Sequence, residues 1–162
     1  RANHEAVEVE AFLQAGGPTH ADPLKRGNVK GGVAFAQPDG CHIDARGVLW
    51  IQTDAHATQM YKGEFARIGN NQMLACDVST GEVRRFLTGP RGCEITGVIM
   101  TPDQRTMFVN VQHPGESTTF WNEQFGAPTT SNPSAVSSWP FGGRPRSATV
   151  VIRKNDGGKI GT

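Results

Sequence analysis

Two strand–turn–strand patterns that lie 58 residues apart are the feature that most restricts the fold of this chain. The first covers residues 41–54 and the second residues 95–111, and each joins two apolar segments through a short polar turn. Trp50 and Phe108 occupy equivalent places in the two patterns. β-Propellers repeat a four-stranded antiparallel sheet about every 40 to 50 residues, and a long loop accounts for the wider spacing. We therefore expect an all-β fold built from successive propeller blades.

The remaining strands can be placed around these two patterns. Glycines and prolines divide the chain into short segments, and no window has an apolar 3.6-residue period long enough to predict a helix. A turn is expected at Pro38-Asp39-Gly40, and hairpin turns at residues 45–47 and 79–81. The expected strands are 7–13, then 41–44, 48–54, 72–78 and 82–87 for one blade, and 95–100, 106–111 and 146–153 for the next.

The number of expected strands is too small for a closed ring. The second blade lacks its fourth strand, and a propeller closes with about four to eight blades. The chain supplies about two blades and an N-terminal strand. We therefore expect residues 1–162 to be part of one larger propeller domain.

Composition excludes several classes of partner. Sixteen basic and fifteen acidic residues leave a net charge of +1, so no electrostatic footprint for nucleic acid is present. The longest apolar runs are far shorter than the roughly 20 residues of a membrane helix, so no membrane span is expected. The odd number of cysteines (Cys41, Cys76 and Cys93) and the absence of a CxxC pair argue against a zinc knuckle or a complete disulfide framework.

Three carboxylates at the ends of expected strands are candidate metal ligands. Asp39, Asp54 and Glu94 lie where propeller loops gather around a central channel, and calcium binds six to eight oxygen ligands. For Asp39 an alternative is an Asx-turn that serves only its own backbone. Glu94 stands between Cys93 and Ile95, and a carboxylate buried there needs a partner.

Other polar residues are weaker candidates. The amides of residues 70–72, Asn71 among them, could coordinate a metal, orient a carboxylate or form an ordinary turn. His113 and Glu116 flank a Pro-Gly pair, and His113 could donate to a phosphate or bind a transition metal. Arg144 and Arg146 could hold an anion. No GxSxG, HExxH or phosphate-binding glycine loop is present, so serine-hydrolase, zincin and nucleotide-binding functions have no support.

Seven segments in order along nearly the whole chain carry a family resemblance. They include the Leu-Trp-Ile-Gln-Thr-Asp run that ends at Asp54 and the Gln-His-Pro-Gly-Glu run that ends at Glu116. The segments are residues 38–40, 49–54, 69–73, 81–90, 92–97, 107–116 and 144–151. Together they resemble the C-terminal part of the PhoX-type alkaline phosphatases.

The resemblance implies a fold, an activity and a location. The implied fold is a six-bladed propeller, exported to the periplasm by the twin-arginine route. The implied activity is hydrolysis of phosphomonoesters at a cluster of iron and calcium ions in the central channel. Asp39, Asp54 and Glu94 are then expected near that cluster, with Asn71 as a further candidate. The metals would hold the phosphate oxygens and neutralise charge in the transition state.

One departure from the family pattern limits these expectations. The Asn-Cys-Ala-Gly-Gly, Cys-Glu-Glu and Arg-Pro-Glu segments of the family have no counterpart here, so Cys93 is not assigned as an iron ligand. We expect the segment to be inactive when isolated. Two functions stay open: the C-terminal part of an exported metal-dependent phosphatase, or a non-catalytic propeller module that binds calcium or a protein partner.

Overall fold

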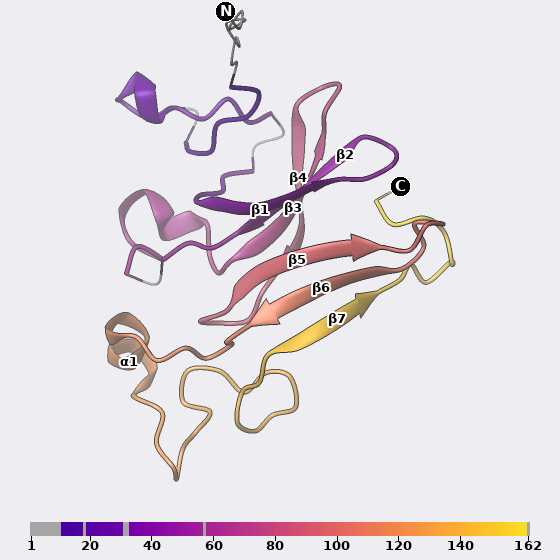
Figure 1. Cartoon of the computed structure of the whole chain (residues 1–162). Helices are drawn as coiled ribbons and strands as arrows, with labels where there is room; N and C mark the ends of the chain where they lie inside the picture. Colours follow the sequence, from indigo (N-terminus) through magenta and orange to yellow (C-terminus); the bar gives the residue numbers. More distant parts are fainter. Residues whose placement is uncertain (1–10, 18, 31–32, 57, 162) are drawn as a thin grey trace, which may run out of the picture.

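The fold consists mainly of two antiparallel sheets, as the sequence predicts. The computed structural model describes residues 11–17, 19–30, 33–56 and 58–161. The first sheet has the strand order β1-β2-β3-β4, formed by β1 (Pro38–Ile43), β2 (Val48–Thr53), β3 (Gln72–Asp77) and β4 (Glu82–Thr88). The second has the order β5-β6-β7, formed by β5 (Glu94–Met100), β6 (Met107–Gln112) and β7 (Ala148–Ile152). Figure 1 shows the two sheets next to each other.

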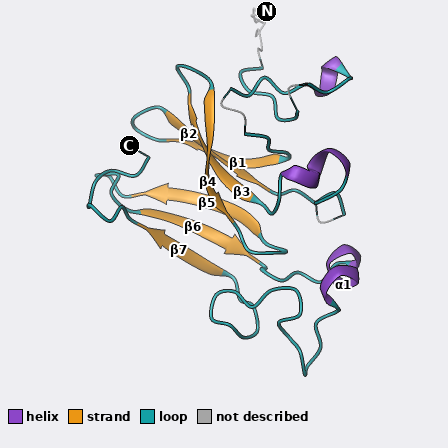
Figure 2. Ribbon diagram, turned by 180° about the vertical axis from the view of Figure 1, so that it is seen from behind, coloured by secondary structure: helices purple, strands orange, loops and turns teal. Residues whose placement is uncertain are grey.

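Short helical segments lie before the first strand and between later strands. The 3-10 helices are η1 (Pro23–Lys25) and η2 (Gly63–Arg67), and one α-helix, α1 (Thr119–Phe125), follows β6. Figure 2 shows η2 and α1 on the same side of the two sheets. The sequence did not predict α1, because seven residues are too few to display a helical period. Thr118 begins this helix by accepting a hydrogen bond from the Trp121 amide, 3.3 Å away, and Gly126 ends it with a φ of +83°.

Two expectations about the N-terminal half need correction. Residues 38–40 are not a turn: they begin β1, and the β1–β2 register is irregular between Pro38 and Cys41. The irregularity is a bulge-like step in an edge strand, where one pairing can be lost at small cost. The strand expected at residues 7–13 falls mostly outside the described residues, and residues 11–13 are not in a strand.

The main core lies between the two sheets. Trp50 from β2 is fully buried in a cluster that also contains Met107, Val109 and Val111 of β6 and Ile95 of β5. Its ring meets Phe86 edge-on, with centroids 4.9 Å apart, and its indole N–H donates to Asp44 at 3.1 Å. Burying a side chain of this kind contributes about 3 kcal/mol. Trp50 is therefore a principal contact between the sheets.

A second cluster covers the opposite face of the first sheet. Ile51, Leu74 and Val83 pack there with Phe35 and with residues of the N-terminal segment. Both faces of β2 are thus buried, whereas β6 alternates between buried and exposed positions. None of the helices among the described residues is long and apolar enough to cross a membrane.

Candidate metal and phosphate site

The ends of four strands meet at one end of the two sheets. Register pairs Pro38 with Thr53 across β1 and β2, and Glu94 with Gln112 across β5 and β6. The start of β1 and the end of β2 therefore coincide, as do the start of β5 and the end of β6. Figure 1 shows both pairs of ends on the side of α1. This arrangement gathers Asp39, Asp54, Glu94 and His113 in one region.

The electrostatic environment of Glu94 includes the other two candidate carboxylates. Burial raises the pKa of Glu94 above its ordinary value, and the carboxylate of Asp54 raises this pKa further. His113 lowers the pKa of Glu94, and Asp39 adds a smaller rise. The side chain of Glu94 is 12% exposed, while Asp39 and Asp54 are exposed. Two carboxylates that raise the pKa of a third in this way fit a bound cation, which would relieve the repulsion.

These carboxylates do not make a complete metal cage alone. Within the part of the chain that the structure describes, no group of three or more His, Cys, Asp or Glu side chains is arranged to hold a metal ion. Hard cations accept additional oxygen ligands from other groups. Asp39, Asp54 and Glu94 could supply some of these oxygen ligands, and a metal centre here would need others.

Asn71 connects the residues beside two of the carboxylates. Its side-chain oxygen accepts hydrogen bonds from the Thr53 hydroxyl (2.9 Å) and the Ala55 amide (2.6 Å), on either side of Asp54. Its side-chain nitrogen donates to the Cys93 carbonyl at 3.0 Å, directly before Glu94. Asn71 is 2% exposed. Of the two chemical roles considered for this amide, its hydrogen bonds favour orienting the carboxylates over direct coordination.

The main chain also fixes the position of Asp54. The Asp54 amide donates to the Gln37 carbonyl at 3.1 Å, which ties it to the segment that precedes Asp39. Gln37 has a φ of +50°, and its side-chain oxygen accepts from the His56 amide at 2.8 Å. A non-glycine residue in the left-handed region is held there by its surroundings. The loop that carries Asp54 is therefore firmly connected to β1.

The loop after β6 packs tightly against the loop before β5. The Gly115 amide donates to the Arg91 carbonyl at 2.8 Å. Gly92 has a φ of +68°, and a Cβ there would lie 2.8 Å from the Glu116 amide nitrogen, so only glycine fits. This contact holds the loop before β5, which leads to Glu94, close to the loop after β6, which contains His113.

His113 lies between two carboxylates. Its Nε2 is 3.7 Å from Glu94 Oε2, and its Nδ1 is 3.9 Å from Glu116 Oε2. The main-chain amide of His113 donates to the Ser147 hydroxyl at 2.9 Å, and its φ is +37°. Because Nδ1 lies 3.2 Å from the Gly92 carbonyl oxygen, Nε2 is the ring nitrogen that can orient Glu94 or meet an anion that enters the site.

Cys93 differs in character from these polar groups. It is 2% exposed, and burial raises the pKa of its thiol to about 12, so the free thiol stays protonated at neutral pH. Cys41 is exposed and Cys76 buried, and all three cysteines are free.

A cavity of about 220 Å³ adjoins Asp54, one of the three candidate ligands. Its polar part is formed by Asp54, His113 and Glu116, and its apolar part includes Met60 and Trp121. The sequence did not single out Met60 or Trp121 for the site. Met60 lies in an irregular loop and Trp121 in the short helix α1. No strand periodicity in the sequence relates either residue to the carboxylates.

Comparison with known proteins places the chain in a family of phosphatases. The family model "Alkaline phosphatase PhoX" matches residues 1–115, more than half of the chain, and the protein belongs to the PhoX alkaline phosphatase family. The chain is also similar to a solved structure, Pseudomonas fluorescens PhoX in complex with vanadate, a transition state analogue, with 41% sequence identity and a TM-score of 0.70. This similarity covers 93% of the present chain and 24% of the PhoX chain, so the chain spans about a quarter of the length of that relative. No curated protein matches the chain.

Proposed function

We propose that this chain is the C-terminal part of an exported, metal-dependent alkaline phosphatase that hydrolyses phosphomonoesters. The observation that carries the proposal is the meeting of Asp39, Asp54 and Glu94 at one end of two sheets. Membership of the PhoX family supports the reaction class. The vanadate complex of the similar Pseudomonas fluorescens protein supports a phosphate ester as the substrate.

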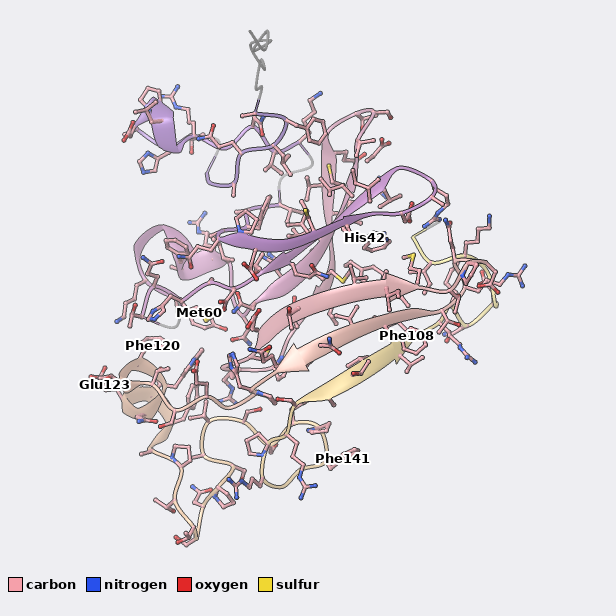
Figure 3. The ribbon with its side chains drawn as sticks, in the orientation of Figure 1. His42, Met60, Phe108, Phe120, Glu123 and Phe141 are labelled. Carbon is pink, nitrogen blue, oxygen red and sulfur yellow. The ribbon has the colours of Figure 1, made fainter. Side chains whose placement is uncertain are left out.

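In this proposal the two sheets are blades of a six-bladed propeller. Support comes from the direction in which the sheets stack. Trp50 lies on the face of the first sheet that packs against the second, and Phe108 is its equivalent 58 residues later. Phe108 shares its face with Ile99 and Val151, which are 64% and 54% exposed (Figure 3). A third sheet of the same polypeptide would cover this face as the second sheet covers Trp50.

The carboxylates of Asp39, Asp54 and Glu94 would hold calcium at the channel end of the blades. When bound, calcium and iron would supply positive charge to the phosphate oxygens and to the charge that develops during hydrolysis. Asn71 holds the Asp54 and Glu94 loops at a fixed separation through its hydrogen bonds. His113 contributes a positioning contact to Glu94 and a donor that can meet an anionic ester.

The iron ligands and the export signal belong, in this proposal, to other parts of the longer protein. The family's cysteine-containing segments have no counterpart in residues 1–162. Twin-arginine export to the periplasm follows from the same family resemblance. Residues 1–162 alone would carry an incomplete centre, and we propose that they are inactive in isolation.

Phosphatase assays of the full-length protein, meaning this chain with whatever else its gene encodes, test the proposal. Hydrolysis of p-nitrophenyl phosphate should stop when a calcium chelator is added and return when calcium is restored. Periplasmic and cytoplasmic fractions should be assayed separately, with activity expected in the former. A purified, metal-loaded protein that hydrolyses no phosphomonoester would contradict the proposal and favour a non-catalytic propeller module.

A further inference from the structure

His56 is an exposed residue on the border of the cavity that adjoins Asp54. It lies two positions after Asp54, and His113 borders the same cavity from the loop after β6. The cavity volume of about 220 Å³ is several times the roughly 30 Å³ that one water molecule occupies in the liquid, so a group the size of phosphate has room. An imidazole on this border can contact a small anion that enters the cavity.

The main chain of His56 is held by hydrogen bonds on both of its sides. Its amide donates to the side-chain oxygen of Gln37 at 2.8 Å. Its carbonyl accepts from the Gln59 amide at 2.9 Å and from the Met60 amide at 3.3 Å. Figure 3 shows Met60 facing Phe120 of α1, and both belong to one buried hydrophobic cluster. The loop is therefore fixed at both ends, and it presents the exposed ring of His56 from a defined position.

The hydrogen bonds of the His56 ring determine which of its nitrogens carries the hydrogen. The Thr58 main-chain amide donates to His56 Nδ1 at 3.3 Å. An amide N–H cannot accept, so Nδ1 holds the lone pair, and the Thr58 hydroxyl, 2.7 Å away, is a second donor to the same atom. The hydrogen of the neutral ring is therefore on Nε2. No described residue accepts a hydrogen bond from this Nε2, which leaves the donor for a ligand.

This position of the hydrogen distinguishes His56 from a metal ligand and from His113. A histidine that binds metal through Nε2 has its lone pair there and carries its hydrogen on Nδ1, whereas the Thr58 amide requires the lone pair of His56 on Nδ1. His113 has the opposite arrangement: its Nδ1 is 3.2 Å from the Gly92 carbonyl oxygen, which only accepts, so its Nε2 donates only when the ring is protonated. His56 offers an N–H donor in its neutral ring.

We propose that the Nε2–H of His56 donates a hydrogen bond to a phosphate oxygen of the bound phosphoester. This proposal rests on the proposed phosphatase function and adds a substrate-binding residue to it. A hydrogen bond to an ionised oxygen is shorter and stronger than one between neutral groups. Because the loop already fixes the ring, little conformational freedom is lost when the ester binds. His56 holds the ester beside Asp54 and takes no part in proton transfer.

Binding of inorganic phosphate to the full-length, metal-loaded protein, measured by calorimetry, tests the proposal without turnover. His56→Asn keeps an amide near the position of Nδ1, and His56→Gln keeps an N–H donor near the position of Nε2. The Asn variant should bind phosphate about 10- to 100-fold more weakly, as expected for a lost hydrogen bond to a charged group, and the Gln variant should stay within about threefold of the native protein. His20→Asn is the matched control, because His20 Nδ1 also accepts from a main-chain amide, that of Asp22 at 2.9 Å, but His20 does not border the cavity. This control should bind phosphate normally.

The metal content of the same samples should be native in both His56 variants, and a loss of metal from His56→Asn overturns the proposal because His56 would then be a ligand. Native phosphate affinity in both variants also overturns it. Equal weakening in both variants does so too, because the effect would then come from Nδ1 and the loop structure. Turnover of p-nitrophenyl phosphate by the native protein distinguishes the failures: turnover with unchanged phosphate affinity in the variants overturns only the role of His56, whereas no turnover overturns the phosphatase function as well.

Discussion

The side-chain amide of Asn71 donates a hydrogen bond of 3.0 Å to the main-chain carbonyl of Cys93, and so joins the two sheets beside Glu94. The oxygen of the same amide accepts hydrogen bonds from the Thr53 hydroxyl and the Ala55 main-chain amide, on either side of Asp54. One buried side chain therefore links the residues on either side of Asp54 to the residue before Glu94. The position of Asn71 before a strand did not reveal in the sequence that its side chain links these two segments by hydrogen bonds.

Replacing Asn71 by Ala should weaken calcium binding by the full-length protein by about 10- to 100-fold, the usual effect of removing a group that orients metal ligands. Calcium titration followed by calorimetry measures this change. Asn155→Ala, at an exposed turn, is the matched control and should bind calcium normally. Unchanged calcium affinity in a folded Asn71→Ala protein would show that the ligands are oriented by other groups.

Asp44 should contribute to stability in a pH-dependent way. Burial by itself would raise the pKa of Asp44, but hydrogen bonds from Arg46, Trp50 and Val48 outweigh burial and hold this pKa below its ordinary value. A carboxyl whose folded pKa is lowered stabilises the fold above the ordinary pKa, and this contribution is lost as pH falls through the folded value. The loss is therefore expected below about pH 4.

Asp44→Asn should lower the free energy of unfolding by about 3 kcal/mol at neutral pH, because Arg46 and the Trp50 indole lose their charged acceptor. Chemical denaturation of the full-length protein at several pH values measures the effect. The difference between the native protein and the variant should shrink at acid pH. Asp156→Asn, at an exposed turn, should leave the denaturation midpoint nearly unchanged, and an equal loss in both variants would refute the role of Asp44.

The strands could be predicted from the sequence because alternating apolar residues and glycine-containing turns are local signals. Gly47 and Gly81 adopt the positive φ values that their hairpin turns require, and β2 and β6 begin and end within two residues of expectation. The pattern failed at Pro38-Asp39-Gly40, which reads as a turn. This segment is part of β1 because Pro38 pairs with Thr53, and pairing with a neighbouring strand can override a local preference for a turn.

The candidate site could be predicted only in part, because only some of its residues are placed by the strands. The three carboxylates lie at or directly beside the ends of strands: Asp39, Asp54 and Glu94. The repeated strand–turn–strand pattern therefore brings them to one end of the sheets. Met60 and Trp121 are separated by 61 residues and come together because the loop before η2 packs against α1. Nothing local to either residue encodes that contact. Their place beside the carboxylates therefore needed the three-dimensional structure.

The isolated segment of residues 1–162 should self-associate and lack phosphatase activity even when calcium and iron are supplied. Ile99 and Val151 expose apolar surface on the Phe108 side of the second sheet, and β7 offers an unpaired edge. Light scattering measures the association. Ile99→Lys combined with Val151→Lys should reduce it, whereas Val78→Lys, at an exposed hairpin turn, should have little effect. A monodisperse segment that hydrolyses phosphomonoesters would contradict this expectation.

The most direct test of the account is the calcium content of the purified full-length protein, measured together with its phosphatase rate. Asp54→Asn combined with Glu94→Gln should reduce bound calcium and lower the rate about 100-fold or more, because both carboxylates would be lost from one centre. The control combines Asp103→Asn with Glu123→Gln and removes the same charge from exposed positions, of which Glu123 can be seen in Figure 3. It should change neither the calcium content nor the rate. Native calcium content and native rate in the folded Asp54 and Glu94 variant would contradict the assignment of these residues to the metal centre.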